Sequence, residues 1–423
     1  MGGDEQARQA ASNGHVEPSE TGLKVALMHD FLLDVRGAER VFEAICHIWP
    51  QADVFTAVYD WRGTEGRFTH RRVHTSFLQY LRPTARTFRP LLPLYPLATE
   101  TLDLSDYDLI VSSSSAWAHG VIKREGAVHV CYCHNPFRYA WNGFEEAVSQ
   151  RNVLLRPMLR ATLRRWRTWD RQAAAHVDHY VANSEATRTR IGEYFDRDAA
   201  VVHPPVDTSR FSRGELGEHY LIISELMSHK RIDVAIEAFN RLGRELFIVG
   251  DGPESRRLAR MAGTTVRLMG RVSDLRVVEL LQSCRALVVT AAEEFGTVAV
   301  EAQACGRPVL ALGAGGALET VHDGVTGRFY GSSDADSLAA LVAQTDPLEF
   351  DPGACIANAE NFNIEHFSQG LREQVALALA AGPTRPPRRP ASRRLGGIPP
   401  VVCAVESEHQ ASSPLHHDTP AHV

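Results

Sequence analysis

Glu293 and Glu301 are the carboxylates whose spacing most clearly suggests chemistry, with seven residues between them. The first follows a predicted strand that ends at Thr290, and the second lies in the first turns of a helix that begins near Thr297. We expect both carboxylates to converge at the C-terminal end of a parallel sheet, the edge where open α/β sheets bind ligands. Carboxylates accept hydrogen bonds from hydroxyls, and the free N–H groups at a helix start suit a diphosphate. The segment therefore predicts a site for a sugar and a diphosphate, although two isolated glutamates would more often be solvated surface charges.

Other short motifs near this segment favour structural roles. The turn Gly313, Gly315, Gly316 should let the backbone approach a ligand closely. Asp334-Ala-Asp336 has the D-x-D form of a metal site, but the apolar run that follows favours a helix N-cap. Gly250-Asp-Gly252 lacks the third glycine of a dinucleotide fingerprint, because Ser255 stands there.

Serine and cysteine motifs give little support for nucleophilic or metal chemistry. Ser112–Ser115 lacks the G-x-S-x-G elbow of a nucleophilic serine and is expected at a strand end. The seven cysteines are scattered, and only Cys131 and Cys133 are close together, in an apolar run. Reduced, buried thiols in a cytosolic protein are favoured over zinc. We predict no metal and no cofactor.

Composition limits the class of protein further. The chain has 423 residues, a length that suits two domains. It has 45 Lys and Arg against 51 Asp and Glu, and this net charge of −6 argues against broad nucleic-acid binding. No apolar run approaches the ~18 residues of a membrane span, and the polar, acidic first twenty residues do not read as a secretory signal. We expect a cytoplasmic protein.

Strands and helices alternate twice along the chain. Apolar runs such as KVALMHDF and VHVCYCHN precede the sequence HPPVD at 203–207, and YLIISEL, ELFIVGDG and ALVVTA follow it. The two prolines of HPPVD predict a hinge. The fold class is therefore α/β, with two doubly wound Rossmann-like domains that face a cleft. The predicted order is a disordered N-terminus (1–21), two domains (22–207 and 208–363), a helix (364–381) and a disordered tail (382–423).

Longer motifs carry a resemblance to a known family. Those of the second half are EEFGTVAVE, ACGRPV, GGALETVHDGVTG, ISELMSHKRIDVAIEAF and VGDGP. Those of the first half are YDLIVSSS, CYCHNPFRYAW, VANS and HPPVD. From about Lys24 to Ala381 the chain resembles retaining glycosyltransferases of the two-domain GT-B type, family 4. The motifs of the first half resemble the branch that includes bacterial O-antigen mannosyltransferases using GDP-mannose.

The resemblance implies a role for each matching residue. Glu301 would hold the ribose hydroxyls, Glu293 the transferred sugar and Lys230 the donor diphosphate, where a cation offsets the charge of the leaving group. His134 would lie beside the reacting carbon, although a lone histidine is more often a buried, hydrogen-bonded one. Gly37 would lie near the donor phosphates and the acceptor. Further donor-binding residues are implied at Arg231, Gly250, Gly252, Arg271, Val272, Phe295, Gly296 and Thr297.

Two residues depart from the family pattern. The family usually has two glycines in the first loop, and here Arg36 replaces one of them. It also commonly has an arginine where this chain has Glu225, which removes one expected partner of the diphosphate. Lys230 and Arg231 should then contribute more to diphosphate binding.

The resemblance implies the transfer of a sugar, with mannose from GDP-mannose as the expected donor. The second domain would bind the nucleotide sugar, and the first would offer a glycan, lipid-linked or small-molecule acceptor. The last helix would return to the first domain. Three alternatives stay open: transfer to a small secondary metabolite, a GT-B binding module without catalysis, and a phosphorylase using pyridoxal phosphate.

The stretch 151–171 is locally basic. Arg156, Arg160, Arg164, Arg167 and Arg171 repeat at helical spacing, and Trp166 and Trp169 lie nearby. This face predicts either a solvated surface with packed aliphatic stems or a peripheral contact with the inner face of a membrane or a lipid diphosphate.

Overall fold

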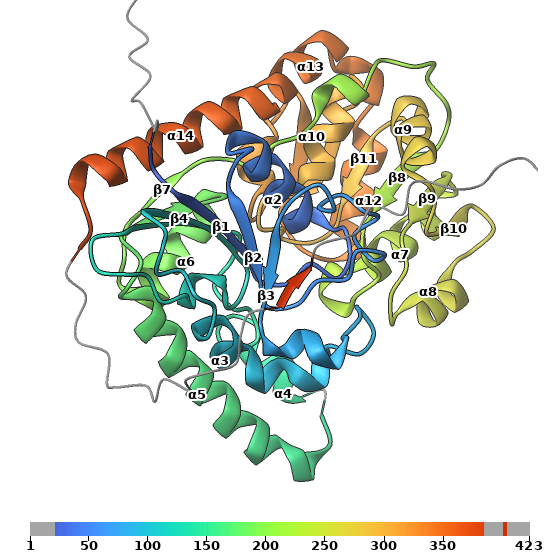
Figure 1. Ribbon diagram of the computed structural model, residues 1–423. Coiled ribbons are helices and arrows are strands. Elements are labelled where there is room, and N and C mark those ends of the chain that lie inside the picture. The colour runs from blue at the N-terminus through green and yellow to red at the C-terminus, as the bar shows by residue number, and fades with distance from the viewer. Residues whose placement is uncertain (1–21, 150, 385–400, 404–423) are drawn as a thin grey trace, which may run out of the picture.

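The computed structural model describes residues 22–149, 151–384 and 401–403, which form two α/β domains (Figure 1). Each domain has its own sheet, and within these ranges only β14 runs antiparallel to its neighbour. Leu27 in the first strand lies in one apolar cluster, whereas Ala26 and Met28 lie in another, because successive side chains point to opposite faces. Burial on both faces is typical of a parallel sheet covered on both sides. The predicted α/β class with two doubly wound domains is confirmed.

The first domain has the strand order β3-β2-β1-β4-β5-β6-β7, with β14 beside β3. Its strands are β1 (Val25–His29), β2 (Asp53–Thr56), β3 (Val73–Thr75), β4 (Leu109–Ser114), β5 (Val128–Cys133), β6 (His179–Ala182) and β7 (Ala199–Val201). Its α-helices are α2 (Gly37–Ile48), α3 (Tyr95–Glu100), α4 (Phe144–Ser149), α5 (Arg156–Ala174) and α6 (Glu185–Phe195). Its 3-10 helices are η1 (Phe77–Leu81), η2 (Arg89–Leu94), η3 (Ala118–Gly120) and η4 (Val153–Leu155).

The second domain repeats this pattern with the order β10-β9-β8-β11-β12-β13. Its strands are β8 (Tyr220–Ile223), β9 (Leu246–Val249), β10 (Val266–Gly270), β11 (Leu287–Val289), β12 (Val309–Leu312) and β13 (Gly327–Tyr330). Its helices are α7 (Ile232–Leu242), α8 (Ser255–Met261), α9 (Asp274–Ser283), α10 (Thr297–Ala304), α11 (Ala317–Thr320), α12 (Ala335–Gln344) and α13 (Pro352–Glu360), with η5 (Thr208–Arg210), η6 (Ser228–Lys230) and η7 (Pro347–Glu349). The order reverses between β8 and β11, so the loops after these two strands diverge and leave room for a ligand.

Helix α2 shows how the sequence sets the start of an element. Glu39 accepts a hydrogen bond from the backbone N–H of Arg36 at 3.0 Å, which satisfies a donor just before the helix. Val41, Phe42 and Ile45, at helical spacing, enter the core of the first domain. The first turn is thereby fixed at the edge of the sheet that faces the second domain.

Two crossings of the chain join the domains and run side by side. The backbone N–H of Val206 donates to the carbonyl of Phe362 at 2.8 Å, directly after Pro204 and Pro205. Beyond the second crossing, α14 (Ile364–Ala381) lies along the first domain in Figure 1. Its residues Phe367, Leu371 and Val375 lie in the same core cluster as α2 and β5. The last helix therefore belongs by its packing to the first domain.

The C-terminal segment differs in part from the expected disorder. Val401–Cys403 pair antiparallel with β3 as β14, at the open edge of the first sheet. Of the predicted disordered tail (382–423), the structure describes this strand and residues 382–384, where the backbone N–H of Thr384 donates to Asp178 at 2.8 Å. Residues 385–400, 404–423 and the predicted disordered N-terminus 1–21 lie outside the described residues. Among the helices that the structure describes, none combines the length and the apolar character needed to cross a bilayer.

Candidate functional site

The C-terminal edges of the two sheets face each other across two adjoining cavities. The larger measures 560 Å³ and lies between the loops after β1, β4 and β5 of the first domain and those after β8 and β11 of the second. The smaller measures 490 Å³ and lies closer to the crossings at Pro205 and Ile364. Gly37, Val41 and Thr297 border both cavities, so the two form adjoining parts of one cleft.

Lys230 and Glu293 form an ion pair on the wall of the larger cavity. The lysine lies at the end of η6, after β8, and the glutamate follows β11, so the two neighbouring strands bring them together. Thr290 fixes the lysine backbone, since its hydroxyl donates to the carbonyl of Lys230 at 2.6 Å. A cation and a carboxylate therefore stand at the point where the strand order reverses.

Helix α10 starts beside this pair. Its N-cap is Gly296, whose φ of +87° is easily adopted only by glycine, and its first residue is Thr297. Phe295, Gly296 and Thr297 all border the larger cavity. The free N–H groups of the first turn and the helix dipole make this helix start suitable for an anion.

The glycine-rich turn has another role than the predicted approach to a ligand. A Cβ at Gly315 would come within 2.4 Å of the carbonyl oxygen of Glu293, and one at Gly316 within 2.3 Å of Phe295 backbone atoms. The backbone N–H of Gly316 donates to the carbonyl of Glu293 at 2.9 Å. These glycines support the loop that carries Glu293, because only residues without a side chain allow the two backbones to lie so close.

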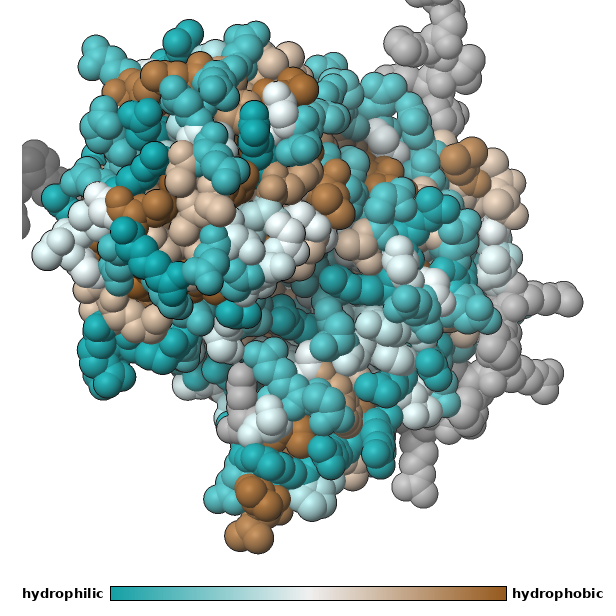
Figure 2. All heavy atoms as spheres, turned by 180° about the vertical axis from the view of Figure 1, so that it is seen from behind, coloured by the Kyte–Doolittle hydropathy of each residue, from teal (hydrophilic) through white to brown (hydrophobic). Residues whose placement is uncertain are grey.

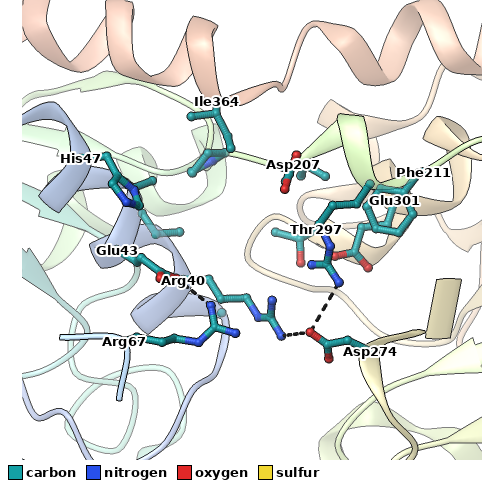
Figure 3. A pocket seen from close by; sticks show the side chains of 16 residues that line it. Arg40, Glu43, His47, Arg67, Asp207, Phe211, Asp274, Thr297, Glu301 and Ile364 are labelled. Carbon is teal, nitrogen blue, oxygen red and sulfur yellow. Dashed lines mark hydrogen bonds and ion pairs between the residues drawn. The ribbon is translucent and has the colours of Figure 1, made fainter. Parts of the chain in front are cut away.

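Glu301 lies in the smaller cavity, and Figure 3 shows it on the same side as Thr297 and Asp207. Burial raises the pKa of its carboxyl group, and the charges of Arg40 and Arg210 partly oppose this effect. We expected Glu293 and Glu301 to converge in one site. In the structure they border two adjoining cavities instead. The helix turns between them separate the two carboxylates along the cleft.

Arg40, Arg210 and Asp274 form a cluster in the smaller cavity that sequence reasoning missed (Figure 3). Asp274 accepts from Arg40 at 2.9 Å and from Arg210 at 3.4 Å. The arginine on α2 comes from the first domain and the aspartate on α9 from the second, so the pair crosses the cleft. The only sequence signal was their position, Arg40 three residues after Gly37 and Asp274 two after Val272.

His134 follows β5 and borders the larger cavity. Its Nε2 lies 2.8 Å from Ser113 Oγ, and the same hydroxyl lies 3.1 Å from Nδ1 of His29. The opposite nitrogen of His29 lies 3.6 Å from a carboxylate oxygen of Glu39. Burial, with a smaller contribution from His29, lowers the pKa of His134 to about 3, so the ring is neutral at ordinary pH. Ser113 belongs to the run Ser112–Ser115 that was expected at a strand end, and it lies near the end of β4. Its hydroxyl orients the ring of His134 through this hydrogen bond.

Arg36 and Glu225, the two departures from the family pattern, also lie on the larger cavity. They form an ion pair of 3.3 Å between the domains, and Arg36 also lies 3.5 Å from Asp34. Arg271 extends these contacts, 4.0 Å from the other oxygen of Asp34. Charged side chains therefore connect the two walls at the cleft mouth.

Five of the residues implied by the resemblance border neither cavity: Arg231, Gly250, Gly252, Arg271 and Val272. A Cβ at Gly250 would lie 1.9 Å from the carbonyl oxygen of Ser224, and one at Gly252 2.5 Å from that of Leu226. These glycines let the turn after β9 pack against the loop that carries Glu225. Arg231 instead pairs with Asp233 at 3.6 Å.

Metal-binding and thiol chemistry find little support in the described residues. Within 22–149, 151–384 and 401–403, no group of three or more His, Cys, Asp or Glu side chains is placed to hold a metal ion. Asp334 accepts from the backbone N–H of Ser337 at 2.8 Å, which confirms the predicted N-cap. Cys131 and Cys133 are buried free thiols, and burial raises the pKa of each.

Comparison with known proteins shows the class to which this fold and cleft belong. The profile described as Glycosyltransferase Family 4 matches residues 35–210, and that described as Glycosyl transferases group 1 matches residues 209–360. The structure is similar to that of HepE from Anabaena in complex with UDP and glucose (TM-score 0.62, 21% identity, 84% of this chain and 99% of that chain). It is also similar to sucrose-phosphate synthase from Thermosynechococcus elongatus (TM-score 0.65, 17% identity, 85% of this chain and 100% of that chain). The fold is that of a two-domain GT-B glycosyltransferase.

The sequence comparisons place the chain within this class. It is 32% identical over 248 residues to the D-inositol 3-phosphate glycosyltransferase of Nocardia farcinica, and the aligned region covers 50% of this chain and 55% of the relative. It is 31% identical over 229 residues to the GDP-mannose-dependent alpha-(1-6)-phosphatidylinositol monomannoside mannosyltransferase of Mycolicibacterium smegmatis, 44% of this chain and 56% of the relative. The chain thus spans little more than half the length of these relatives. It belongs to the GT-B glycosyltransferases of family 4.

Proposed function

We propose that this protein transfers a sugar from a nucleotide diphosphate donor, with retention of anomeric configuration. The observation that carries the proposal is the Lys230–Glu293 pair beside the start of α10, on the wall of a cleft between two domains. Lys230 and the N–H groups of α10 offset the charge that the diphosphate gains as it leaves. Glu293, displaced from the lysine by the phosphate, accepts hydrogen bonds from hydroxyls of the transferred sugar.

The nucleoside would extend into the smaller cavity. The Glu301 carboxylate lies on the wall of this cavity, and its two oxygens can accept hydrogen bonds from the two ribose hydroxyls. Thr297, on the border of both cavities, marks the passage from diphosphate to ribose. The acceptor would enter from the first domain, where His134 and Ser115 border the larger cavity.

Attack from the same face as the leaving group accounts for retention. Among the described residues, the carboxylates on the larger cavity are Glu225, Glu293 and Glu294, all from the donor side. Of the described first-domain residues that border this cavity, none is a carboxylate that could act as a nucleophile. In the proposed step the acceptor oxygen bonds to the anomeric carbon, the bond from that carbon to the phosphate oxygen breaks, and the departing phosphate takes the acceptor proton. The protein contributes orientation and charge stabilisation.

We propose GDP-mannose as the donor and a glycan or lipid-linked glycan as the acceptor. Support comes from the motifs of the first domain and from the GDP-mannose-dependent relative. A further argument is chemical, because guanine presents adjacent N–H groups that can donate to a carboxylate. Asp274 lies on the smaller cavity, just beyond Arg271 and Val272, which the resemblance implies as donor-binding residues. A small acceptor bearing a phosphate is the second candidate, favoured by the relatives named for D-inositol 3-phosphate.

Calorimetric titration with GDP, UDP and ADP tests the donor side, with EDTA present because we propose a reaction that needs no metal. The expected result is binding of GDP alone, weakened in Glu301→Gln. A preference for UDP or ADP would overturn the guanine assignment and keep the reaction class. Absence of binding to all three, together with no hydrolysis of any sugar nucleotide, would overturn the catalytic proposal in favour of a binding module.

A further inference from the structure

The N-terminal end of α5 protrudes from the first domain and exposes apolar side chains. Val153, Leu154, Leu155 and Met158 are 67%, 86%, 50% and 65% exposed. This end of α5 is the lowest point of the molecule in Figure 1, and Figure 2 shows hydrophobic surface at the same lower tip. Soluble proteins commonly expose single apolar side chains scattered over their surface. Several that gather on one projection indicate a contact surface instead.

Two sequence stretches of the first domain are rich in arginine, one of which forms this apolar end of α5. The stretches 77–97 and 151–169 hold nine arginines and no Asp or Glu, in a chain whose net charge is −6. Those with exposed side chains include Arg82, Arg86, Arg89, Arg160, Arg164 and Arg165. The surface therefore combines aliphatic groups with a local excess of positive charge, opposite in sign to the whole chain.

The two stretches lie side by side. Trp169 on α5 donates a hydrogen bond to Glu100 on α3 at 2.7 Å. Phe88 and Leu92 pack against the same core cluster as Trp166. These contacts join the stretch 77–97 to the second half of α5.

The arginines in the second half of the predicted basic face are engaged within the first domain, although Arg171 remains exposed. Arg167 donates to the carbonyl of Ala140 at 2.9 Å and lies over the ring of Trp141, while Arg171 donates to the carbonyl of Tyr194 at 2.8 Å. Trp166 and Trp169 pack against Trp117 in the core. The second half of α5 thus anchors the helix, and the first half carries the exposed groups.

We propose that this surface, which we call the α5 tip (residues 151–165), docks on an anionic lipid bilayer. The aliphatic side chains at the end of α5 enter the headgroup region, and the arginines bind lipid phosphates. A projecting apolar point with a basic collar matches the chemistry of a membrane interface, whereas a protein partner would need an acidic concave surface. The residues of η4 and Met158 in the first turn of α5 are exposed aliphatic side chains, which a merely solvated surface would not need.

The α5 tip is connected to the catalytic cleft through α4. Glu145 on α4 pairs with Arg160 at 3.2 Å. The next residue, Glu146, accepts from Ser228 of η6 at 3.1 Å and lies 3.8 Å from Arg138, which borders the larger cavity. Docking would therefore place the cleft mouth near the lipid surface, where a lipid-linked acceptor is available. This last step rests on the proposed function.

Co-sedimentation of the full chain with vesicles tests the proposal. We expect binding to phosphatidylcholine vesicles that contain phosphatidylglycerol, weak binding to pure phosphatidylcholine, and loss of binding as salt rises. Arg164→Glu with Arg165→Glu should weaken binding about fivefold or more per arginine. Leu154→Ser with Met158→Ser should also weaken it. The matched controls are Arg372→Glu on α14 and Leu348→Ser on η7, two exposed sites of the same types elsewhere on the protein, which should bind as the wild type does.

Equal binding of the tip variants and the wild type, or no binding of the wild type to anionic vesicles, would overturn the proposal. A stable protein complex that the tip variants abolish, in place of vesicle binding, would also overturn it. GDP titration of the same variants separates this proposal from the proposed function. Tip variants that no longer bind vesicles but still bind GDP would support the docking surface. A wild-type protein that binds vesicles but no sugar nucleotide would support docking and contradict the proposed transfer reaction.

Discussion

Arg36 and Glu225 form an ion pair of 3.3 Å between the two walls of the cleft. Each residue departs from the family pattern, and together they place a cation on the first domain and an acid on the second. Both side chains are more than half exposed, so the pair itself adds only about 0–1 kcal/mol to stability. Its larger effect should fall on a diphosphate, which Arg36 attracts and Glu225 repels.

Replacement of Glu225 by Gln should tighten GDP binding about three- to tenfold, because it removes a negative charge near the phosphates and releases Arg36 to bind them. Calorimetry at low and high salt measures the gain, which should shrink as salt rises. Glu218→Gln is the control, since that glutamate pairs with Arg285 at 3.0 Å outside the cleft. Weaker GDP binding in Glu225→Gln would mean that the carboxylate itself contacts the donor.

Lys230→Met should lower kcat about a hundredfold while the KM for the donor changes little, because the lysine stabilises charge that develops only as the diphosphate leaves. Steady-state kinetics with a sugar nucleotide measure both constants, and Lys230→Arg should restore part of the rate. Lys24→Met, at a site that pairs with Asp106 at 3.4 Å, serves as the control for the loss of a lysine. A rise in KM with kcat unchanged would assign Lys230 to ground-state binding instead.

Glu301→Gln should stabilise the ligand-free protein at neutral pH and weaken GDP binding about tenfold or more. Burial raises the pKa of this carboxyl group on folding, so ionising it costs more free energy in the native state than in the unfolded chain. The resulting stability is present at pH values below the ordinary carboxyl pKa and is lost as the pH rises through the raised value. Melting curves at several pH values test this: the difference in Tm between variant and wild type should shrink as the pH falls. An unchanged Tm at neutral pH would contradict the burial of an ionised Glu301.

The sequence predicted the strands that carry the donor side because each is a short apolar run followed by polar residues. Strands β8 and β11 and the positions of Lys230 and Glu293 after them follow from this pattern. Strands β2, β3 and β13 escaped prediction, because each mixes polar with apolar side chains and so contains no continuous apolar run. Periodicity cannot define elements that short.

Contacts between the domains could not be predicted from one sequence. Arg40 and Asp274 are 234 positions apart and meet only because the cleft brings α2 opposite α9. The same holds for Arg36 and Glu225, which the sequence marked separately as departures without indicating that they pair. Local sequence determines which edge of a sheet bears a residue, whereas the relative placement of two domains depends on the hinge and on α14.

His134 and His129 offer a matched pair for separating stability from catalysis. Burial lowers the pKa of each ring from 6.5 to about 3, and each nitrogen Nε2 lies 2.8 Å from a serine hydroxyl of β4. Their positions differ, because His134 borders the larger cavity and His129 is fully buried. Below pH 6.5 both rings are protonated in the unfolded chain, whereas in the native state they stay neutral down to about pH 3. The contribution of the neutral rings to the free energy of unfolding is therefore fully present above pH 6.5 and falls as the pH drops.

Each histidine should therefore remove about 2 kcal/mol of stability between pH 7.5 and pH 5. Urea unfolding at the two pH values should show this loss reduced by a similar amount in His134→Asn and in His129→Asn. Sugar transfer should fall only in His134→Asn, since His134 alone reaches the cavity. The pH profile of wild-type kcat should show no break near 6.5 from His134, because its ring stays neutral there. Equal loss of transfer in both variants would reduce His134 to a packing role, and a break near 6.5 that His134→Asn abolishes would contradict its lowered pKa.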